Sequence, residues 1–198
     1  MGRHTETDRF YAELWPHRGV VLRVAKLLTH SDVDAEDLAQ EALLKAFNKI
    51  NTLTPESNAK AWLLTILRHT HIDRVRSRHH GNGEVSLDAL NVDQPAPEHA
   101  PPEDVSAWGD PHRAMAGFSD QEVIVALKRV PEEIRWTLLL VDVQGLDDQE
   151  AADVLGVPTG TVKSRLHRGR RMLREHLMPV AIDRRLYAAL KAKENASG

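Results

Sequence analysis

The stretch DDQEAADVLGVPTGTVKSRLHRGRR, residues 147 to 171, decides the fold that the sequence predicts for its second half. A short helix is expected through Leu155, because Asp147 and Glu150 have the spacing of a capping box. Gly156 supplies a tight turn, and a second helix follows it. A short helix, a glycine turn and a second helix are typical of a helix-turn-helix.

The second helix of this stretch is expected to begin with Thr159 as its cap and to run to about Leu177. Its outward face combines hydroxyl and basic side chains, namely Thr161, Lys163, Ser164, Arg165 and Arg168, followed by Arg170, Arg171 and Arg174. In the major groove, arginine can contact guanine bidentately, and the remaining cations can neutralise phosphates. A solvated cationic helix of a structural bundle is the alternative. Charge, capping and the glycine turn together favour DNA binding.

The residues before this motif predict two more helices, which complete a helical domain of residues 119–178. Ser119 and Glu122 have the spacing of a capping box and precede an apolar run. Pro131 is expected at the first position of the next helix, and Gly145 is expected to end it.

Residues 1–80 predict another domain, built from three helices. The first spans residues 7–28 and is bent or restarted at Pro16. The second is expected to have Asp34 as its cap, and the third opens near Asn58. The third helix becomes basic toward its end, through Arg68, Arg74, Arg76 and Arg78. No segment alternates convincingly as a strand would, so the predicted fold class is all-α.

Residues 81–118 separate the two predicted domains and are rich in proline, which resists regular structure. The acidic residues of this segment outnumber its single arginine, Arg113. They are Glu84, Asp88, Asp93, Glu98, Glu103, Asp104 and Asp110. We therefore expect a flexible acidic linker between two small helical domains. Its acids either restrain the basic second domain from DNA or only keep the segment soluble. Residues 179–198 predict a tail with one short amphipathic helix, whose role the sequence leaves open.

The composition of the 198 residues is that of a globular protein, with 41% hydrophobic and 28% charged residues. No apolar run approaches the roughly 20 residues that cross a bilayer, no secretory signal is present and cysteine is absent. We therefore expect a cytoplasmic protein without membrane insertion. The formal net charge of −3 does not by itself indicate a nucleic-acid binder, but the basic residues are concentrated in two predicted helices.

Three segments of the chain together resemble one known family. EAADVLGVPTGTVKSRLHRGRRMLR (150–174) resembles the region-four helix-turn-helix of extracytoplasmic-function (ECF) sigma factors. DAEDLAQEALLKAF (34–47) resembles their region-two helix that binds polymerase, and AWLLTILRHTHIDRVRSR (61–78) resembles the adjoining helix that engages the minus-ten element. The resemblance covers both predicted domains in the right order.

This resemblance implies a subunit that brings core RNA polymerase to promoters and helps to open them. The first domain would bind the clamp of the largest polymerase subunit and melt promoter DNA. The second domain would read the minus-thirty-five element near the polymerase flap. Core RNA polymerase, promoter DNA and an anti-sigma factor are the implied partners. No cofactor, metal or enzymatic activity is expected.

The same resemblance assigns residues to these tasks. For polymerase binding it indicates Asp34, Asp37, Leu38, Gln40 and Glu41, whose acceptors could meet a basic coiled coil but could also form a merely solvated face. For DNA binding it indicates Arg68, His69, Arg74, Arg76 and Arg78 on one helix, and Thr161, Lys163, Ser164, Arg165, Arg168 and Arg171 on the other. Many relatives carry Asn where this chain has His69, so base selection at that position stays open.

Two other functions remain as alternatives. A helix-turn-helix regulator would bind DNA without core polymerase, although residues 1–80 are too short for a receiver domain. A metal-dependent nuclease would use histidines and one acid of the third helix, namely His69, His71, His79, His80 and Asp73. His69 and His71 point about 200° apart on a helix, which argues against a shared ion.

Overall fold

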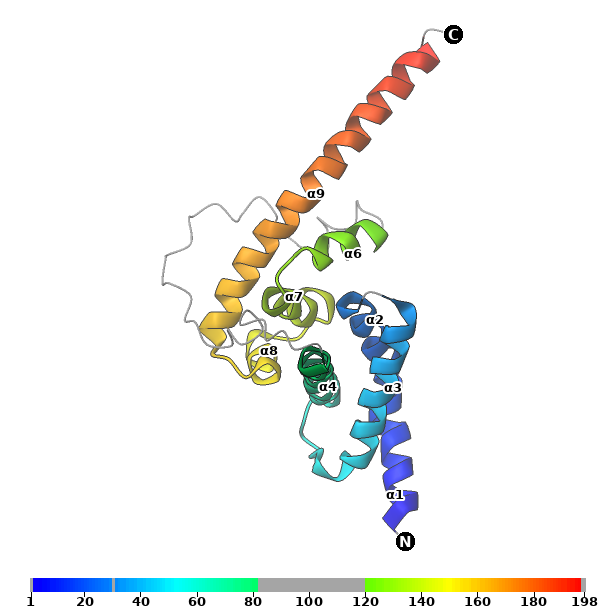
Figure 1. Ribbon diagram of the computed structural model, residues 1–198, viewed down its shortest axis with the longest axis vertical. Coiled ribbons are helices and arrows are strands. Elements are labelled where there is room, and N and C mark those ends of the chain that lie inside the picture. The colour runs from blue at the N-terminus through cyan, green and yellow to red at the C-terminus, as the bar shows by residue number, and fades with distance from the viewer. Residues whose placement is uncertain (1, 30, 82–119, 197–198) are drawn as a thin grey trace.

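The structure is a computed structural model that describes residues 2–29, 31–81 and 120–196. Its elements in chain order are α1 (Gly2–Arg9), the π-helical turn η1 (Phe10–Leu14), the 3-10 turn η2 (Trp15–His17), α2 (Arg18–Leu28), α3 (Asp32–Asn48), η3 (Ile50–Thr52), α4 (Ala59–Gly81), α6 (Asp120–Lys128), α7 (Glu132–Leu138), the π-helical turn η6 (Leu139–Val143), α8 (Asp148–Leu155) and α9 (Thr159–Ala196). All regular elements in these ranges are helical, which confirms the all-α fold class (Figure 1). Ser119 and residues 82–118 of the predicted linker lie outside the described residues.

The first predicted helix is interrupted where the sequence places Pro16 and restarts after it. The α-helical hydrogen bonding gives way to the wider π-helical turn η1 and then to the tighter 3-10 turn η2. The α-helix resumes as α2 at Arg18. Proline supplies no N–H to a helix, and its ring crowds the preceding turn. In the interrupting turn η1, Phe10 packs edge-on against Phe47 of α3, with the ring centroids 5.4 Å apart. Of the predicted bend or restart at Pro16, the restart is confirmed.

Side-chain caps define where α3 and α4 begin. Ser31 has an extended backbone, and its hydroxyl accepts a hydrogen bond from the Asp34 amide at 3.1 Å. The prediction that Asp34 caps this helix is therefore wrong, because Ser31 already holds the cap position and Asp34 lies in the first turn. Asn58 precedes α4 as predicted, and its Oδ1 accepts from the amides of Lys60 and Ala61.

The helix α7 begins one residue later than the sequence predicts. Pro131 occupies the N-cap and Glu132 the first helical position. The ψ of Pro131 is 142°, which is extended, so this residue leads into the helix and is not part of it. Gly145 ends the following turn with a φ of 66°, in the left-handed region that favours glycine. The predicted end is confirmed, and the predicted start is corrected.

The helix-turn-helix forms as the sequence predicts. The Glu150 amide donates to Asp147 Oδ1 at 2.8 Å, and the Asp147 amide donates to Glu150 Oε2 at 3.0 Å, so the capping box is complete. Gly156 has a φ of 67° at the turn between α8 and α9. Both signals are local in the sequence, and both are confirmed.

Both predicted boundaries of the last helix need correction. Thr159 is the first residue of α9 rather than its cap, because the carbonyl of Pro158 already accepts from the Val162 amide at 3.2 Å. The helix also continues past Leu177 and through Pro179 to Ala196. A proline inside a helix removes one backbone hydrogen bond, and this loss does not interrupt α9.

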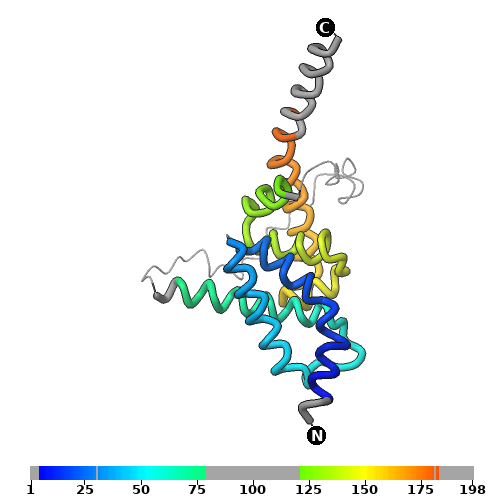
Figure 2. The backbone as a smooth tube through the Cα atoms, turned by 90° about the vertical axis from the view of Figure 1, so that its right-hand side faces the viewer, coloured from blue at the N-terminus to red at the C-terminus, as the bar shows by residue number. Residues whose placement is uncertain are grey.

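The two domains lie against each other. Within the first domain α3 packs on α2 and α4, and within the second domain α9 packs on α7 and α8. Between the domains, α4 packs on α8 and α2 on α6. Figure 1 shows α4 between α3 and α8, and Figure 2 shows the α6–α9 half above the α1–α4 half. Buried apolar residues from both halves form a common core, including Leu38, Leu63, Leu67, Leu140, Leu155 and Leu173.

Candidate nucleic-acid and partner-binding surfaces

A close helix contact fixes α9 on α7. A Cβ atom at Gly169 would lie 2.8 Å from Ile134 Cγ2 and 2.9 Å from Leu138 Cδ1, so only glycine lets the two helices approach this far. Real Cβ atoms do not approach other atoms so closely. The basic half of α9 is therefore held at a defined distance from the body of the second domain.

A buried ion pair gives α9 a second anchor. Arg170 donates from Nη2 to Asp142 Oδ1 at 2.6 Å and from Nε to Asp142 Oδ2 at 3.1 Å. The Asp142 side chain is only 5% exposed, and its hydrogen bond raises the pKa of Arg170 further. The sequence places Arg170 among the outward cations, and this is wrong, because the guanidinium points into the domain and pairs with η6.

The outward face of α9 carries three exposed cations, Lys163, Arg168 and Arg171. Thr161 and Ser164 are partly exposed beside them, and the Ser164 hydroxyl donates to the Thr161 carbonyl at 3.0 Å. Four of these five positions follow one another at intervals of three or four residues and therefore share one helix face. The structure therefore leaves these five side chains at least partly exposed, and their role in reading DNA stays a prediction.

Arg165 does not lie openly on that face. Its side chain is only 16% exposed, and its Nη2 lies 3.5 Å from Glu133 Oε2 of α7. It also lies near enough to Arg68 of α4 that the two charges repel each other. The expectation that Arg165 points outward is therefore corrected, because an acid of its own domain draws the guanidinium inward.

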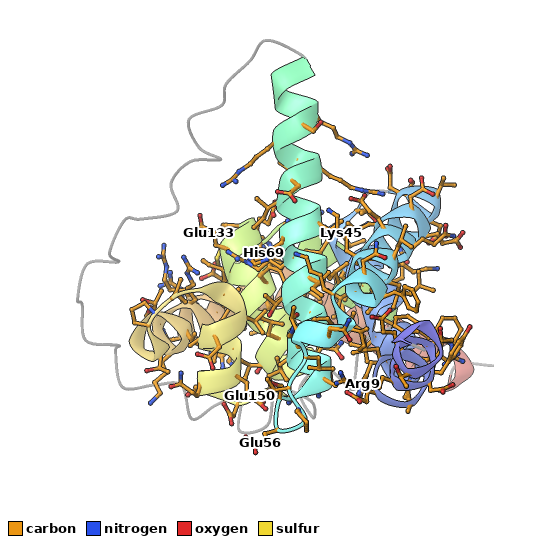
Figure 3. The ribbon with its side chains drawn as sticks, turned by 90° about the horizontal axis from the view of Figure 1, so that it is seen from below. Arg9, Lys45, Glu56, His69, Glu133 and Glu150 are labelled. Atoms are coloured by element: carbon orange, nitrogen blue, oxygen red, sulfur yellow. The ribbon has the colours of Figure 1, made fainter. Side chains whose placement is uncertain are left out.

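The basic end of α4 divides into paired and unpaired cations. Arg74 donates to Glu41 Oε2 at 2.6 Å and to the Asp37 carbonyl at 2.9 Å. Arg78 donates to Asp34 Oδ1 at 2.9 Å. His69 and Arg76 are exposed, in contrast to the partly buried Arg68. Figure 3 shows α4 between α3, which carries Lys45, and α7, which carries Glu133.

The acids predicted to bind polymerase and the arginines predicted to bind DNA therefore form ion pairs with each other between α3 and α4. The hydroxyl of Ser31 and then Arg78 hold the pKa of Asp34 below its ordinary value. Burial would raise the pKa of Glu41, but hydrogen bonds from Lys45 and Arg74 outweigh it, and the pKa is lowered. Both carboxylates stay charged at neutral pH and hold the two helices together.

The outer face of α3 is partly apolar. Asp37 and Gln40 are exposed there, while Leu38 is fully buried in the core. Direct contact of Leu38 with a partner, which its assignment to polymerase binding implies, does not fit this burial. Sequence reasoning missed Val33, which is 70% exposed, and Leu44, which is 63% exposed.

A regular spacing could have identified these apolar residues. Val33, Asp37, Gln40 and Leu44 follow at intervals of four, three and four residues, which places them along one side of α3. This side of the helix therefore offers two exposed apolar side chains with polar ones between them. The α3 stripe, as we call these four residues, is thus the candidate partner surface.

Sequence reasoning also missed the residues that join the domains. His71 of α4 is buried, and its Nε2 lies 3.0 Å from Glu132 Oε1 of α7. Asn58 Nδ2 donates to Glu150 Oε1 at 2.6 Å, and Lys60 Nζ donates to the Gln144 carbonyl at 2.7 Å. These partners are more than 60 residues apart in the chain, so periodicity could not reveal them.

Among the residues that the structure describes, no helix combines the length and the apolar composition that a membrane span requires. No group of three histidine or acidic side chains in the same ranges could hold a metal ion. His71, one histidine of the nuclease alternative, is instead engaged with Glu132.

Two family models match the two helical domains in order. Residues 16–80 match sigma-70 region 2, and residues 120–173 match sigma-70 region 4. The chain therefore belongs to the sigma-70 family.

Curated relatives and solved structures narrow this class. The chain is 35% identical over 161 residues to the ECF RNA polymerase sigma factor SigE of Mycolicibacterium smegmatis, covering 81% of this chain but only 58% of SigE. It is 32% identical over 169 residues to the ECF sigma factor SigL of Mycobacterium tuberculosis, covering 85% of this chain and 88% of SigL. The sigma factor RpoE of Bartonella quintana, solved in complex with the anti-sigma factor NepR, aligns with a TM-score of 0.65 at 29% identity, over 85% of this chain and 96% of RpoE.

The chain is thus an ECF RNA polymerase sigma factor, a protein of transcription initiation. The resemblance read from the three sequence segments is confirmed, as is the helix-turn-helix of region 4. Sigma factors are subunits that act with RNA polymerase and are not enzymes themselves, in agreement with the sequence-based expectation.

Proposed function

We propose that this sigma factor binds the clamp of the largest subunit of core RNA polymerase through the α3 stripe. The observation that carries the proposal is the stripe itself, in which exposed acceptors lie between two exposed apolar side chains. Such a surface complements a basic amphipathic coiled coil, with apolar residues meeting apolar ones and Asp37 meeting a cation. Asp34 and Glu41 support the stripe indirectly, because they hold α4 against α3.

Promoter DNA would be bound by both basic helices. Lys163, Arg168 and Arg171 of α9 suit phosphates and guanines of the minus-thirty-five element, near the polymerase flap. On α4, His69 and Arg76 are available for the separated strand at the minus-ten element, since an imidazole can stack on an unpaired base. Arg74 and Arg78 would contribute after their partners on α3 release them, and Arg68 would contribute once it is no longer partly buried.

An anti-sigma factor would control this protein. The support is the likeness to RpoE of B. quintana, which was solved with the anti-sigma factor NepR and aligns over both domains. A cytoplasmic location would follow from these partners, because promoter DNA and RNA polymerase are found there. A helix-turn-helix regulator without polymerase is the rival function, and footprinting separates the two. A regulator protects DNA alone, whereas a sigma factor protects a promoter only together with core polymerase.

Charge reversal on α3 tests the polymerase surface. Asp37→Lys together with Leu44→Lys should abolish co-purification with core polymerase, because it places two cations on a face proposed to meet a basic partner. Both positions are exposed, so the free energy of unfolding should change by less than about 1 kcal/mol in total. Glu56→Lys is the matched control, since Glu56 is an exposed acid of the same domain that lies outside α3. Unchanged binding by the Asp37–Leu44 variant would contradict the proposal.

A further inference from the structure

The helix α9 is held by its domain at two separated points. At its N-terminal end the turn at Gly156 joins it to α8, and Thr159 begins the helix. Further along, Arg170 pairs with the buried Asp142. Thr159 and Arg170 are eleven residues apart, or roughly 16 Å along a helix. Four candidate DNA contacts lie between these points, namely Thr161, Lys163, Ser164 and Arg168.

The second point connects α9 to the start of α8 without passing through the glycine turn. Asp142 lies in η6, the turn that leads toward α8. The Leu146 amide donates to the Leu140 carbonyl at 3.0 Å, so η6 and the residues that lead into α8 are themselves connected. Arg170 is also attracted by the charge of Asp148 in the first turn of α8. The Arg170 guanidinium therefore restrains the angle between the two helices of the helix-turn-helix.

The backbone of η6 gives Asp142 its direction. The Gln144 amide donates to the Leu139 carbonyl at 3.0 Å, five residues earlier, which is the hydrogen bond of a π-helix. A π-helical turn holds more residues than an α-helical turn, so the residues after Leu138 do not continue the faces of α7. From this wider turn the Asp142 side chain, only 5% exposed, points toward α9. An unbroken α-helix would aim residue 142 elsewhere.

The ion pair restrains rotation as well as position. Arg170 Nη2 donates to Asp142 Oδ1 at 2.6 Å, and Nε donates to Oδ2 at 3.1 Å. Two such parallel hydrogen bonds align the planar guanidinium with the planar carboxylate, which a single contact would not do. Beside the pair, Gly169 lies against Ile134 and Leu138 of α7 and sets the distance between the helices. The segment with the candidate contacts is thus fixed in depth and in rotation.

Base contacts and phosphate contacts differ in how much displacement they tolerate. A hydrogen bond to a base edge requires its donor to be held within roughly 0.5 Å of the productive position. A phosphate contact depends more on charge than on angle. Without the second point, α9 could pivot about the turn at Gly156. Its exposed cations would keep their attraction for DNA, while the alignment with base edges would be lost.

We propose that Asp142 and Arg170 are positioning residues for promoter selectivity, and that their ion pair sets the rotation and the depth of α9 in the major groove. This inference rests on the proposed reading of the minus-thirty-five element by α9. It adds two residues on the inner side of the domain, and neither of them contacts DNA. Selectivity among promoters and general affinity for DNA should therefore respond separately to their substitution.

The test compares selectivity with general affinity in the holoenzyme. The probes are a promoter duplex that the parent holoenzyme selects from a random pool and the same duplex with each upstream base pair changed in turn. Arg170→Lys keeps the positive charge but replaces the planar fork with an ammonium group. Its preference for the selected duplex over the changed ones should fall about tenfold. Its affinity for an unrelated duplex should stay within about twofold at every salt concentration, because the exposed cations are unchanged.

Asp142→Asn is the independent second variant, and it should lose selectivity to the same extent. Its matched control is Asp153→Asn, because Asp153 is an exposed acid of α8 that accepts from Gln149 at 3.0 Å. Both substitutions remove one negative charge from the second domain, and only the control should keep the selectivity of the parent protein. Binding is measured at a temperature at which far-UV circular dichroism shows the variants folded.

The outcomes separate this inference from the proposed function. Reduced selectivity with unchanged general affinity in Arg170→Lys and Asp142→Asn supports the positioning role. Selectivity equal to that of the parent protein, or an equal loss of affinity for all duplexes, would overturn it and leave the pair with a structural role alone. If the parent holoenzyme prefers no upstream sequence, the proposed reading of DNA by α9 fails, and this inference fails with it.

Discussion

The two basic helices of this sigma factor use their arginines in opposite ways. On α4, Arg74 and Arg78 pair with acids of the neighbouring α3, and Arg76 points to solvent. On α9 the arrangement is reversed, since one buried pair of Arg170 anchors the helix and the cations around it stay exposed. Similar sequence composition thus gives one helix whose basic end is braced by partly exposed ion pairs and another that is anchored on its inner side while its outer cations stay exposed.

This difference suits the two tasks that we propose. A helix that captures a separated strand must be stiff beyond the bundle, and ion pairs to α3 brace the part of α4 that reaches toward Gly81. A recognition helix must instead offer exposed cations to a DNA groove, and its own position on the domain must be fixed so that it enters the groove to a defined depth. The close approach of α9 to α7 at Gly169 and the ion pair of Arg170 with Asp142 fix the position of α9 on its domain.

The largest expected effect comes from removing the anchor of α9. Asp142→Ala leaves Arg170 partly buried without its partner, which should lower the free energy of unfolding of the second domain by about 3 kcal/mol. Urea denaturation followed by circular dichroism measures it. The control is Glu175→Ala, because Glu175 and Arg171 are both exposed and 3.8 Å apart, and its cost should stay below about 0.5 kcal/mol. Equal costs for the two variants would show that α9 is not held by this pair.

How far the sequence predicts such features depends on how local their causes are. The capping box of Asp147 and Glu150 and the left-handed Gly156 follow from neighbours in the chain, and both are as predicted. The cap of α3 was assigned three residues too late, because Ser31 and Asp34 are both good capping residues and only the backbone geometry distinguishes them. Local rules therefore gave the helices and both ends of α8, whereas the starts of α3 and α7 and both ends of α9 needed the structure.

Tertiary partners account for most of what the sequence could not predict. Leu38 lies in the core, and Arg165 and Arg170 turn toward acids of α7 and η6, although helical spacing alone allows each of the two arginines to face solvent. The pair of Arg74 and Glu41 joins residues 33 positions apart. Periodicity assigns a residue to a face, but only packing decides which face is covered.

A smaller effect should distinguish the exposed cations from the paired ones. Lys163→Ala removes an exposed cation from α9, so the salt dependence of holoenzyme binding to an upstream promoter duplex should become shallower by about one unit of slope. Arg74→Ala should leave that slope unchanged and instead lower the free energy of unfolding of the first domain by about 1 kcal/mol. Titrations across a salt series measure the first quantity, and urea denaturation measures the second. A changed slope in Arg74→Ala would mean that Arg74 also contacts upstream DNA.

The smallest effect concerns the pH dependence of the brace between α3 and α4. The pKa of Glu41 is lowered in the folded protein, because hydrogen bonds from Lys45 and Arg74 outweigh the effect of burial. A carboxyl group with a lowered folded pKa contributes stability that is fully present above its unfolded value of about 4.5 and is lost as the pH falls through its folded pKa. Glu41→Gln removes this titration. The free energy of unfolding of the Glu41→Gln variant should therefore lie below that of the parent protein at pH 7, by less than about 1 kcal/mol because Glu41 is partly exposed. The difference should shrink as the pH falls below about 4.5. Urea denaturation at a series of pH values measures it, with Glu36→Gln as the control, since Glu36 is exposed on the same helix. A difference that stays constant with pH would show that the ion pair with Arg74 does not brace α4.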